Sequence, residues 1–167
     1  MGQSLIGYLS MNSWSSCIKN EQMMLQLGAD LASCFSDQHG LISFYGDLGA
    51  GKSTMIRGFI KACGYQGHVK SPTYTLMEPY SVADKTFFHL DLYRLEDPQE
   101  LEFIGIRDLF DDNAVTLVEW PEKGAGVLPE PVIKVEIEHL DSGRQVRITA
   151  VAPAAASIIN ELTEIYN

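Results

Sequence analysis

The stretch Gly46-Asp47-Leu48-Gly49-Ala50-Gly51-Lys52-Ser53-Thr54 decides the fold of this chain of 167 residues. It has the pattern G-x-x-x-x-G-K-[ST], and it follows the apolar run 41–45. The segment after it has apolar residues at helical spacing, namely Met55, Ile56, Phe59, Ile60 and Cys63. Strand, glycine-rich loop and helix form the context in which this pattern binds phosphate. The sequence therefore predicts an α/β domain of the P-loop NTPase type.

Each residue type in this loop suits phosphate binding. Gly46 and Gly51 permit backbone angles that a side chain would forbid, so successive N–H groups can point into one concavity. The N-terminus of the following helix adds partial positive charge. We expect Lys52 to reach the β- and γ-phosphates of a nucleotide and the Ser53 hydroxyl to ligate Mg²⁺. The expected nucleotide-binding residues are Gly46, Asp47, Leu48, Gly49, Ala50, Gly51, Lys52, Ser53 and Thr54.

Composition narrows the choice of partners. The chain carries 12 Lys and Arg against 22 Asp and Glu, which gives a net charge of −10. This charge argues against a broad surface that follows the phosphates of DNA or RNA, although a protein partner could itself hold RNA.

No apolar run approaches membrane-spanning length. The 3 cysteines are widely spaced and form no C-x-x-C pair, so we expect a reduced, cytoplasmic location.

The remaining elements follow from periodicity and turn residues. Residues 1–13 have no clear period and are predicted to be an N-terminal extension, for which disorder is one interpretation; residues 14–167 are predicted to be one domain. Asn20 is the expected N-cap of a first helix. A capping box at 97–100 predicts a helix that turns Leu101 and Ile104 inward and stops at Gly105. Strands are expected at 86–90 and 114–118, a hairpin at 133–150 and a closing helix at 154–166.

Two predicted strands end in an acid, Asp91 and Glu119. Carboxyl ends of parallel strands converge on the ligand crevice, and a phosphate loop needs an acid to hold or orient a metal shell. We therefore favour a functional role for both acids over solvated strand ends. Thr73, after the turn set by Pro72, could contact the γ-phosphate as switch residues do, although β-propensity alone also explains it.

Other residues have two interpretations each. Arg94 is either a stabiliser of phosphate charge or the surface ion-pair partner of Asp91 or Glu96. Trp120 is either a core residue or an exposed binding hot spot.

Absent patterns bear on the reaction. The sequence has no N-K-x-D, the pattern that reads guanine, so ATP is the expected nucleotide. The segment 122–131 has Lys123 as its sole basic residue, whereas P-loop kinases of small molecules usually carry an arginine-rich lid. ATP hydrolysis coupled to a conformational change therefore fits better than transfer of phosphate to a metabolite. A binding module that never turns over is the other alternative.

The stretches 46–54, 71–76, 89–94 and 118–121 together resemble, in order and spacing, the bacterial TsaE family, formerly YjeE. The resemblance covers roughly Asn20 to Val151. Members of this family are small ATPases needed to form N6-threonylcarbamoyladenosine (t6A) beside the anticodon of tRNAs that read ANN codons.

The resemblance implies a small P-loop fold with a mixed, mostly parallel sheet flanked by helices, in which the C-terminal hairpin supplies antiparallel strands. It implies TsaD and TsaB proteins as partners, with tRNA reached only through their complex and with no role for DNA or a membrane. Threonylcarbamoyl transfer itself would belong to TsaD.

The resemblance also implies ATP and Mg²⁺ as cofactors and a set of site residues. Ser53 and Glu119 would serve the metal, and Lys52 and the loop backbone would bind phosphates. Asp91 would act in hydrolysis or in positioning the metal. The implied catalytic residues are Asp91, Glu119 and Thr73, and the residues implied to border the nucleotide are Glu21 and Arg144.

Overall fold

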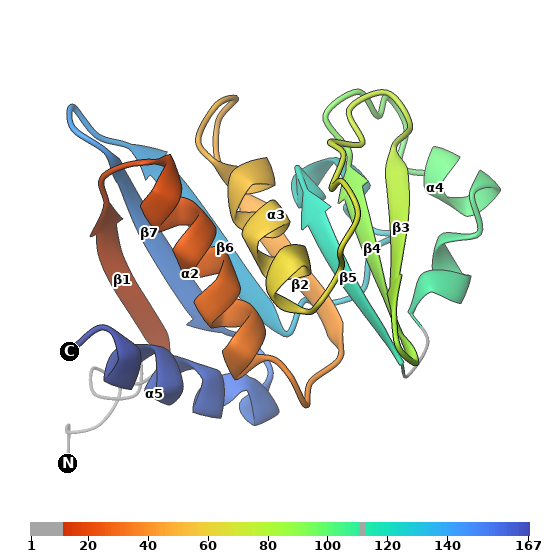
Figure 1. Cartoon of the computed structure of the whole chain (residues 1–167). Coiled ribbons are helices and arrows are strands. Elements are labelled where there is room, and N and C mark those ends of the chain that lie inside the picture. Colours follow the sequence, from red (N-terminus) through yellow and green to blue (C-terminus); the bar gives the residue numbers. More distant parts are fainter. Residues whose placement is uncertain (1–11, 111–112) are drawn as a thin grey trace, which may run out of the picture.

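A central β-sheet organises the molecule, as the computed structural model shows for residues 12–110 and 113–167 (Figure 1). Its 7 strands lie in the order β1-β7-β6-β2-β5-β4-β3. The strands are β1 (Ser13–Ile18), β2 (Gly40–Tyr45), β3 (Met77–Val82), β4 (Lys85–Asp91), β5 (Ala114–Glu119), β6 (Ile133–His139) and β7 (Arg144–Ala150). The helices are α2 (Glu21–Cys34), α3 (Lys52–Ala62), α4 (Glu100–Phe103) and α5 (Ala156–Ile165), with 3₁₀ turns η1 (Ile106–Leu109), η2 (Pro121–Gly124) and η3 (Pro153–Ala155).

The sheet is mixed, which confirms the predicted α/β fold. Strand β2 pairs in parallel with β5 and β6, and β4 pairs in parallel with β5. The pairs β1–β7, β6–β7 and β3–β4 are antiparallel. The description "mostly parallel" is therefore approximate, because it applies to the centre of the sheet, where the phosphate loop leaves β2.

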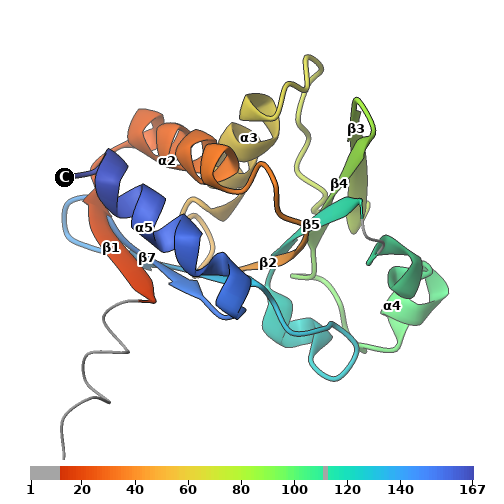
Figure 2. The same ribbon diagram turned by 90° about the horizontal axis from the view of Figure 1, so that it is seen from below.

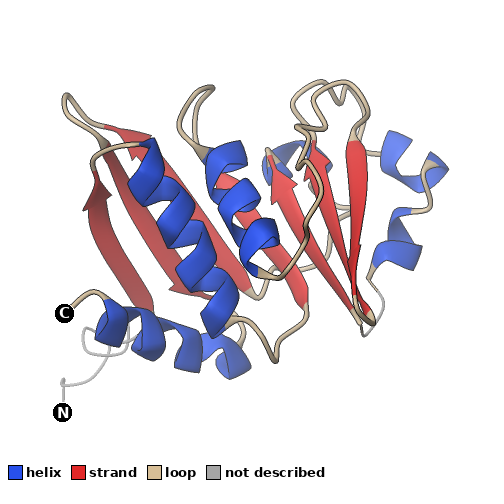
Figure 3. Cartoon of the chain, viewed as in Figure 1, coloured by secondary structure: helices blue, strands red, loops and turns tan. Residues whose placement is uncertain are grey.

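Helices cover both faces of the sheet (Figures 2 and 3). Helices α2, α3 and α5 lie on one face, and α4 with the neighbouring short turns lies on the other. The apolar core divides in the same way. One cluster packs under α2, α3 and α5, and a second, which includes Leu90, Leu101 and Val118, lies toward α4.

Close contact between α2 and α3 depends on two glycines. A Cβ atom built on Gly28 would lie 2.0 Å from the carbonyl oxygen of Met55, and one on Gly58 would lie 2.2 Å from that of Leu25. Each helix thus presents a bare backbone to the other. This contact brings the start of α2 beside the phosphate loop.

Most predicted element positions are confirmed. The side chain of Asn20 caps α2 by accepting the Met23 N–H at 2.9 Å. Half of the predicted capping box forms, because the Asp97 N–H donates to Glu100 Oε1 at 2.9 Å, but Asp97 Oδ1 accepts the Gln99 N–H and α4 begins only at Glu100. The strands before Asp91 and Glu119, the C-terminal hairpin and the closing helix all form.

Two details of the chain differ from the sequence-based expectation. Ile104 is 36% exposed rather than inward, because α4 ends at Phe103 and Gly105 turns the chain at φ 69°, so that Ile106 takes the buried place. Strand β1 was not anticipated: Ser13, which we assigned to the extension, begins it. Residues 1–11 of that extension lie outside the described residues.

Within the described parts of the chain, no helix has the length and apolar character needed to span a bilayer. The cysteines Cys17, Cys34 and Cys63 are free. Burial raises the pKa of Cys34 and of Cys63 to about 11, so both thiols stay protonated at neutral pH.

Candidate active site

The loop between β2 and α3 has the backbone that its glycines were expected to provide. Gly49 has φ 74° and Gly51 has φ 113°, values that favour glycine. A Cβ on Gly51 would lie 3.0 Å from Met24 Cε, and one on Gly46 would lie 2.7 Å from the Ile137 carbonyl oxygen. The loop therefore packs closely between α2 and β6, and a side chain at Gly46 or Gly51 would displace the loop.

Lys52, the first residue of α3, points back into the loop. Its side chain is buried, and its ammonium group donates to the carbonyl oxygens of Gly46 and, at 3.1 Å, of Asp47. Burial lowers the pKa of Lys52, and the nearby carboxylates of Glu119 and Asp91 oppose that shift. The buried ammonium group is thus held by neutral carbonyl oxygens, and the oxygens of a bound anion could take their place.

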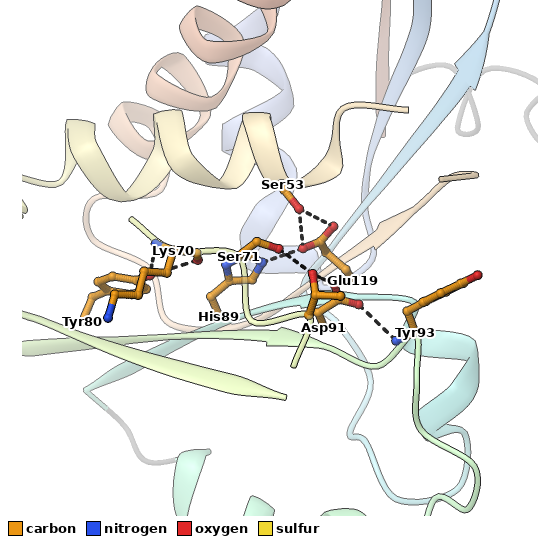
Figure 4. Close-up of polar contacts among 9 residues, drawn as sticks. Ser53, Lys70, Ser71, Tyr80, His89, Asp91, Tyr93 and Glu119 are labelled. Carbon is orange, nitrogen blue, oxygen red and sulfur yellow. Dashed lines mark hydrogen bonds and ion pairs between the residues drawn. The ribbon is translucent and has the colours of Figure 1, made fainter. Parts of the chain in front are cut away.

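Ser53 and Glu119 meet at the start of α3 and the end of β5. The Ser53 hydroxyl lies 2.9 Å from both carboxylate oxygens of Glu119, which is 3% exposed. The close-up in Figure 4 shows this contact together with a second one from the opposite side, where His89 Nε2 lies 2.7 Å from Glu119 Oε2. The predicted metal residues are thus in direct contact.

His89 is a site residue that the sequence analysis missed. It is 1% exposed, and among the described residues its Nδ1 atom has no hydrogen-bond partner. A signal for it was present. His89 lies two residues before Asp91 on an apolar strand, and side chains two apart on a strand share one face.

The second strand-end acid, Asp91, lies directly opposite Glu119 in the β4–β5 register. Its Oδ1 atom accepts the Tyr93 N–H at 3.0 Å, and its Oδ2 atom is 3.5 Å from the Thr73 hydroxyl. That hydroxyl is 2.8 Å from Ser71 Oγ. Burial raises the pKa of Asp91, and the Tyr93 N–H partly offsets the rise. Both acids and Thr73 therefore share one crevice, as predicted.

Cavities border the loop on more than one side. The first, about 420 Å³, is lined by loop residues 48–54 together with Thr73, Asp91, Arg94, Glu119 and Trp120. The second, about 260 Å³, lies across the loop and is bordered by residues 49–51 and Thr54 together with Glu21 and Arg144. Gly46 and Asp47 instead border a third, acidic hollow beside Glu122, Glu136 and Glu138.

The residues expected to border the nucleotide, Glu21 and Arg144, share the second cavity. Arg144 donates to the carbonyl oxygens of Ala50 at 3.2 Å and Gly49 at 3.3 Å, which ties the hairpin to the loop. Glu21 forms an exposed ion pair of 2.8 Å with Arg57.

Arg94 and Trp120 differ from parts of what the sequence offered for them: Arg94 forms no described ion pair with Asp91 or Glu96, and Trp120 is neither fully buried nor fully exposed. The Arg94 guanidinium lies over the Tyr74 ring, 4.5 Å from its centroid. Trp120 is half-buried, with its ring beside the Lys52 ammonium. Its φ of 56° is a strained value for a non-glycine residue, a feature that clusters at functional sites.

Comparison with known proteins identifies the family. The model of the family described as "Threonylcarbamoyl adenosine biosynthesis protein TsaE" matches residues 18–146. The chain belongs to the TsaE family. It is 45% identical to the Haemophilus influenzae tRNA threonylcarbamoyladenosine biosynthesis protein TsaE over 154 residues, which cover 90% of this chain and 98% of that one.

Two further comparisons give lower identities. The protein of the same name from Bacillus subtilis is 33% identical over 136 residues, covering 81% of this chain and 85% of that one. A crystal structure of Bacillus subtilis YdiB superposes with a TM-score of 0.67 at 24% identity, covering 93% of this chain and 95% of that chain. This likeness confirms the fold.

The site has side-chain oxygens of the kind that Mg²⁺ bound together with a nucleotide would need. Mg²⁺ prefers oxygen ligands and usually binds through one or two carboxylates together with substrate phosphates. The Ser53 hydroxyl and the Glu119 carboxylate supply such oxygens beside the loop. Within residues 12–110 and 113–167, no group of 3 or more His, Cys, Asp or Glu forms a metal cage, so a metal here would depend on phosphate oxygens.

Proposed function

We propose that this chain binds ATP with Mg²⁺, hydrolyses it slowly, and thereby serves the formation of t6A in tRNA. The observation that carries the hydrolase part is the meeting of Ser53 with the buried carboxylate of Glu119 beside the loop that holds Lys52. Support for the biological role comes from the family, whose members are named for threonylcarbamoyladenosine biosynthesis.

In this proposal the loop N–H groups and the α3 N-terminus bind the phosphates. Lys52 exchanges the carbonyl oxygens of Gly46 and Asp47 for phosphate oxygens. Ser53 and Glu119 hold the metal, which when bound would neutralise charge on the phosphates. Asp91, buried and held by the Tyr93 N–H, accepts a hydrogen bond from the attacking water and so orients it.

The second cavity suits the nucleoside. It lies across residues 49–51 from the acids and is open to solvent beside Glu21 and Arg144. Because the sequence lacks the guanine-reading N-K-x-D, we expect ATP to bind more tightly than GTP. A competition assay in which GTP displaces labelled ATP better than unlabelled ATP does would contradict this choice.

The proposed partners are the TsaD and TsaB proteins, met in the cytoplasm. A net charge of −10 makes the chain a poor direct binder of tRNA. Leu48, which lines the first cavity, is 61% exposed, and Tyr74, which contacts the cavity residue Arg94, is 85% exposed. Large exposed apolar side chains at the mouth of a nucleotide site suit contact with a protein, and a γ-phosphate sensed at Thr73 would alter that contact.

The test uses purified TsaD–TsaB complex and measures its binding to this chain in ATP, in ADP and without nucleotide, with a tRNA gel-shift beside it. We expect partner affinity to depend on the nucleotide and no measurable tRNA binding by the chain alone at physiological salt. Equal partner affinity in all states, together with tight tRNA binding by the chain, would contradict the proposal. Phosphate release, alone and with partners, separates a hydrolase from a binding module that never turns over.

A further inference from the structure

We propose that His89 is a positioning residue for Glu119. Its hydrogen bond fixes the orientation of this carboxylate, so that one oxygen faces Ser53 and the metal. The inference rests on the proposed function, since it concerns the binding of nucleotide with Mg²⁺.

The contact is short and fully enclosed. His89 Nε2 lies 2.7 Å from Glu119 Oε2, and the exposed fractions of the two side chains are 1% and 4%. Among the described residues Nδ1 is buried without a partner. A proton on Nδ1 would therefore be a buried donor with no acceptor, which is costly. The tautomer that fits carries its proton on Nε2 and donates it to Glu119.

Glu119 needs such a donor because Ser53 alone does not fix it. The Ser53 hydroxyl lies 2.9 Å from each carboxylate oxygen, and it has a single proton to donate. Because this one hydroxyl is equally distant from the two oxygens, it does not prevent the carboxylate from rotating. His89 binds Oε2 and not Oε1, so it distinguishes the two oxygens. Oε1 is then left to interact with Ser53 and with a metal shell.

The location of His89 suits a residue that positions Glu119 without touching the nucleotide. His89 is opposite Leu117 in the β4–β5 register, two residues along the strands from the Asp91–Glu119 pair. It contacts Glu119 in the buried part of the site, and it is not among the residues that line the 420 Å³ cavity. It therefore acts through Glu119 and not on the nucleotide. Outer partners of this kind, when mutated, typically cost 10- to 100-fold in metal affinity or activity.

The test compares His89→Asn with His89→Gln. The amide nitrogen of glutamine can take roughly the place of Nε2 and donate to Glu119, whereas the shorter asparagine cannot reach it. Dissociation constants for ATP are measured by calorimetry with Mg²⁺ and with EDTA, and the ratio of the two reports the metal-dependent part of binding. Thermal unfolding of each variant is recorded in parallel.

We expect His89→Asn to lower the Mg²⁺ enhancement of ATP affinity about tenfold or more, with the EDTA value within about twofold of wild type. His89→Gln should retain most of the enhancement. In the background of Glu119→Gln, the further change His89→Asn should have no added effect on the ratio, because the partner through which it acts is already altered.

Three results would overturn the inference. One is a wild-type Mg²⁺ ratio in His89→Asn. Another is a loss of ATP affinity in His89→Asn that is equally large in Mg²⁺ and in EDTA, which would indicate that His89 serves only packing. The third is an equal loss of the ratio in the Asn and Gln variants. If His89→Asn does not fold, His89→Leu takes its place, because leucine fills a similar volume without a donor. If Mg²⁺ does not enhance ATP binding by the wild-type protein, the proposed function fails together with the inference. If the wild-type protein shows the enhancement and His89→Asn keeps it, only the inference fails.

Discussion

The ammonium group of Lys52 lies 4.3 Å from the centroid of the Trp120 ring. This contact joins the lysine of the phosphate loop to the residue directly after Glu119, the last residue of β5. The Trp120 ring also packs against Tyr93, with 5.1 Å between ring centroids, so it connects the loop to the segment after Asp91. In the proposed function Lys52 turns from its loop carbonyls to a phosphate, and this movement would change the surroundings of the indole ring.

Tryptophan fluorescence should therefore report nucleotide binding. The chain has 2 tryptophans, and the other, Trp14, packs against Tyr166 at 4.9 Å between ring centroids. We expect Trp14→Phe to keep the fluorescence change on addition of ATP and Mg²⁺, and Trp120→Phe to lose it. A change that survives in Trp120→Phe would show that the signal does not arise at the loop.

The two strand-end acids should differ in what they do. Glu119→Gln removes the charge beside Ser53, so it should weaken ATP binding in Mg²⁺ while binding in EDTA stays close to wild type. Asp91→Asn should keep ATP affinity within a few-fold and lower the hydrolysis rate by about 10²-fold or more, because the attacking water loses the carboxylate that orients it. Calorimetry and phosphate release measure the two effects. Wild-type turnover in both variants would contradict the assignment.

Asp91 also predicts a pH dependence of stability. Burial raises the pKa of Asp91 above the ordinary value of 3.8, so the folded state binds more protons than the unfolded state just above that pH. The ionised carboxylate therefore destabilises the fold, by an amount that is absent below pH 3.8 and grows as the pH rises through the raised pKa. Asp91→Asn should raise the Tm by roughly a few degrees at neutral pH, with a smaller gain near pH 4. A gain that does not change with pH would contradict this account.

The close packing of α2 on α3 predicts a large effect of one methyl group. In Gly28→Ala the added Cβ would lie 2.0 Å from the carbonyl oxygen of Met55, so the helices must separate. We expect a loss of about 1–3 kcal/mol or more in the free energy of unfolding, measured by urea denaturation. The control is Ser33→Ala on the exposed side of α2, which should change stability by no more than about 0.5 kcal/mol. Equal effects of the two substitutions would show that the contact is looser than described.

Local patterns were enough to predict the parts of the site that lie at the ends of regular elements. The loop at 46–54 has its own glycines, and Asp91 and Glu119 each follow an apolar strand, so their positions could be predicted from adjacent residues. The parallel pairing of β4 with β5 then brings the two acids together.

Features that depend on distant residues could not be predicted in this way. Strand β1 has the sequence SWSSCI, which carries little strand signal, and it forms at the edge of the sheet by pairing with β7. The place of Arg94 is set by the Tyr74 ring, on a different segment of the chain. The contact of His89 with Glu119 likewise needs the β4–β5 register, which the sequence does not display.

The most direct test of the central claim, that this loop binds ATP, is calorimetry of ATP with Mg²⁺ on wild type and Lys52→Ala. Loss of a buried charge partner costs about 3–5 kcal/mol, so we expect affinity to fall by roughly 10²- to 4 × 10³-fold. The control is Lys61→Ala at the far end of α3, where the ammonium contacts the carbonyl oxygen of Gly67, and it should bind ATP as wild type does. Equal ATP affinity in folded Lys52→Ala and wild type would contradict the claim.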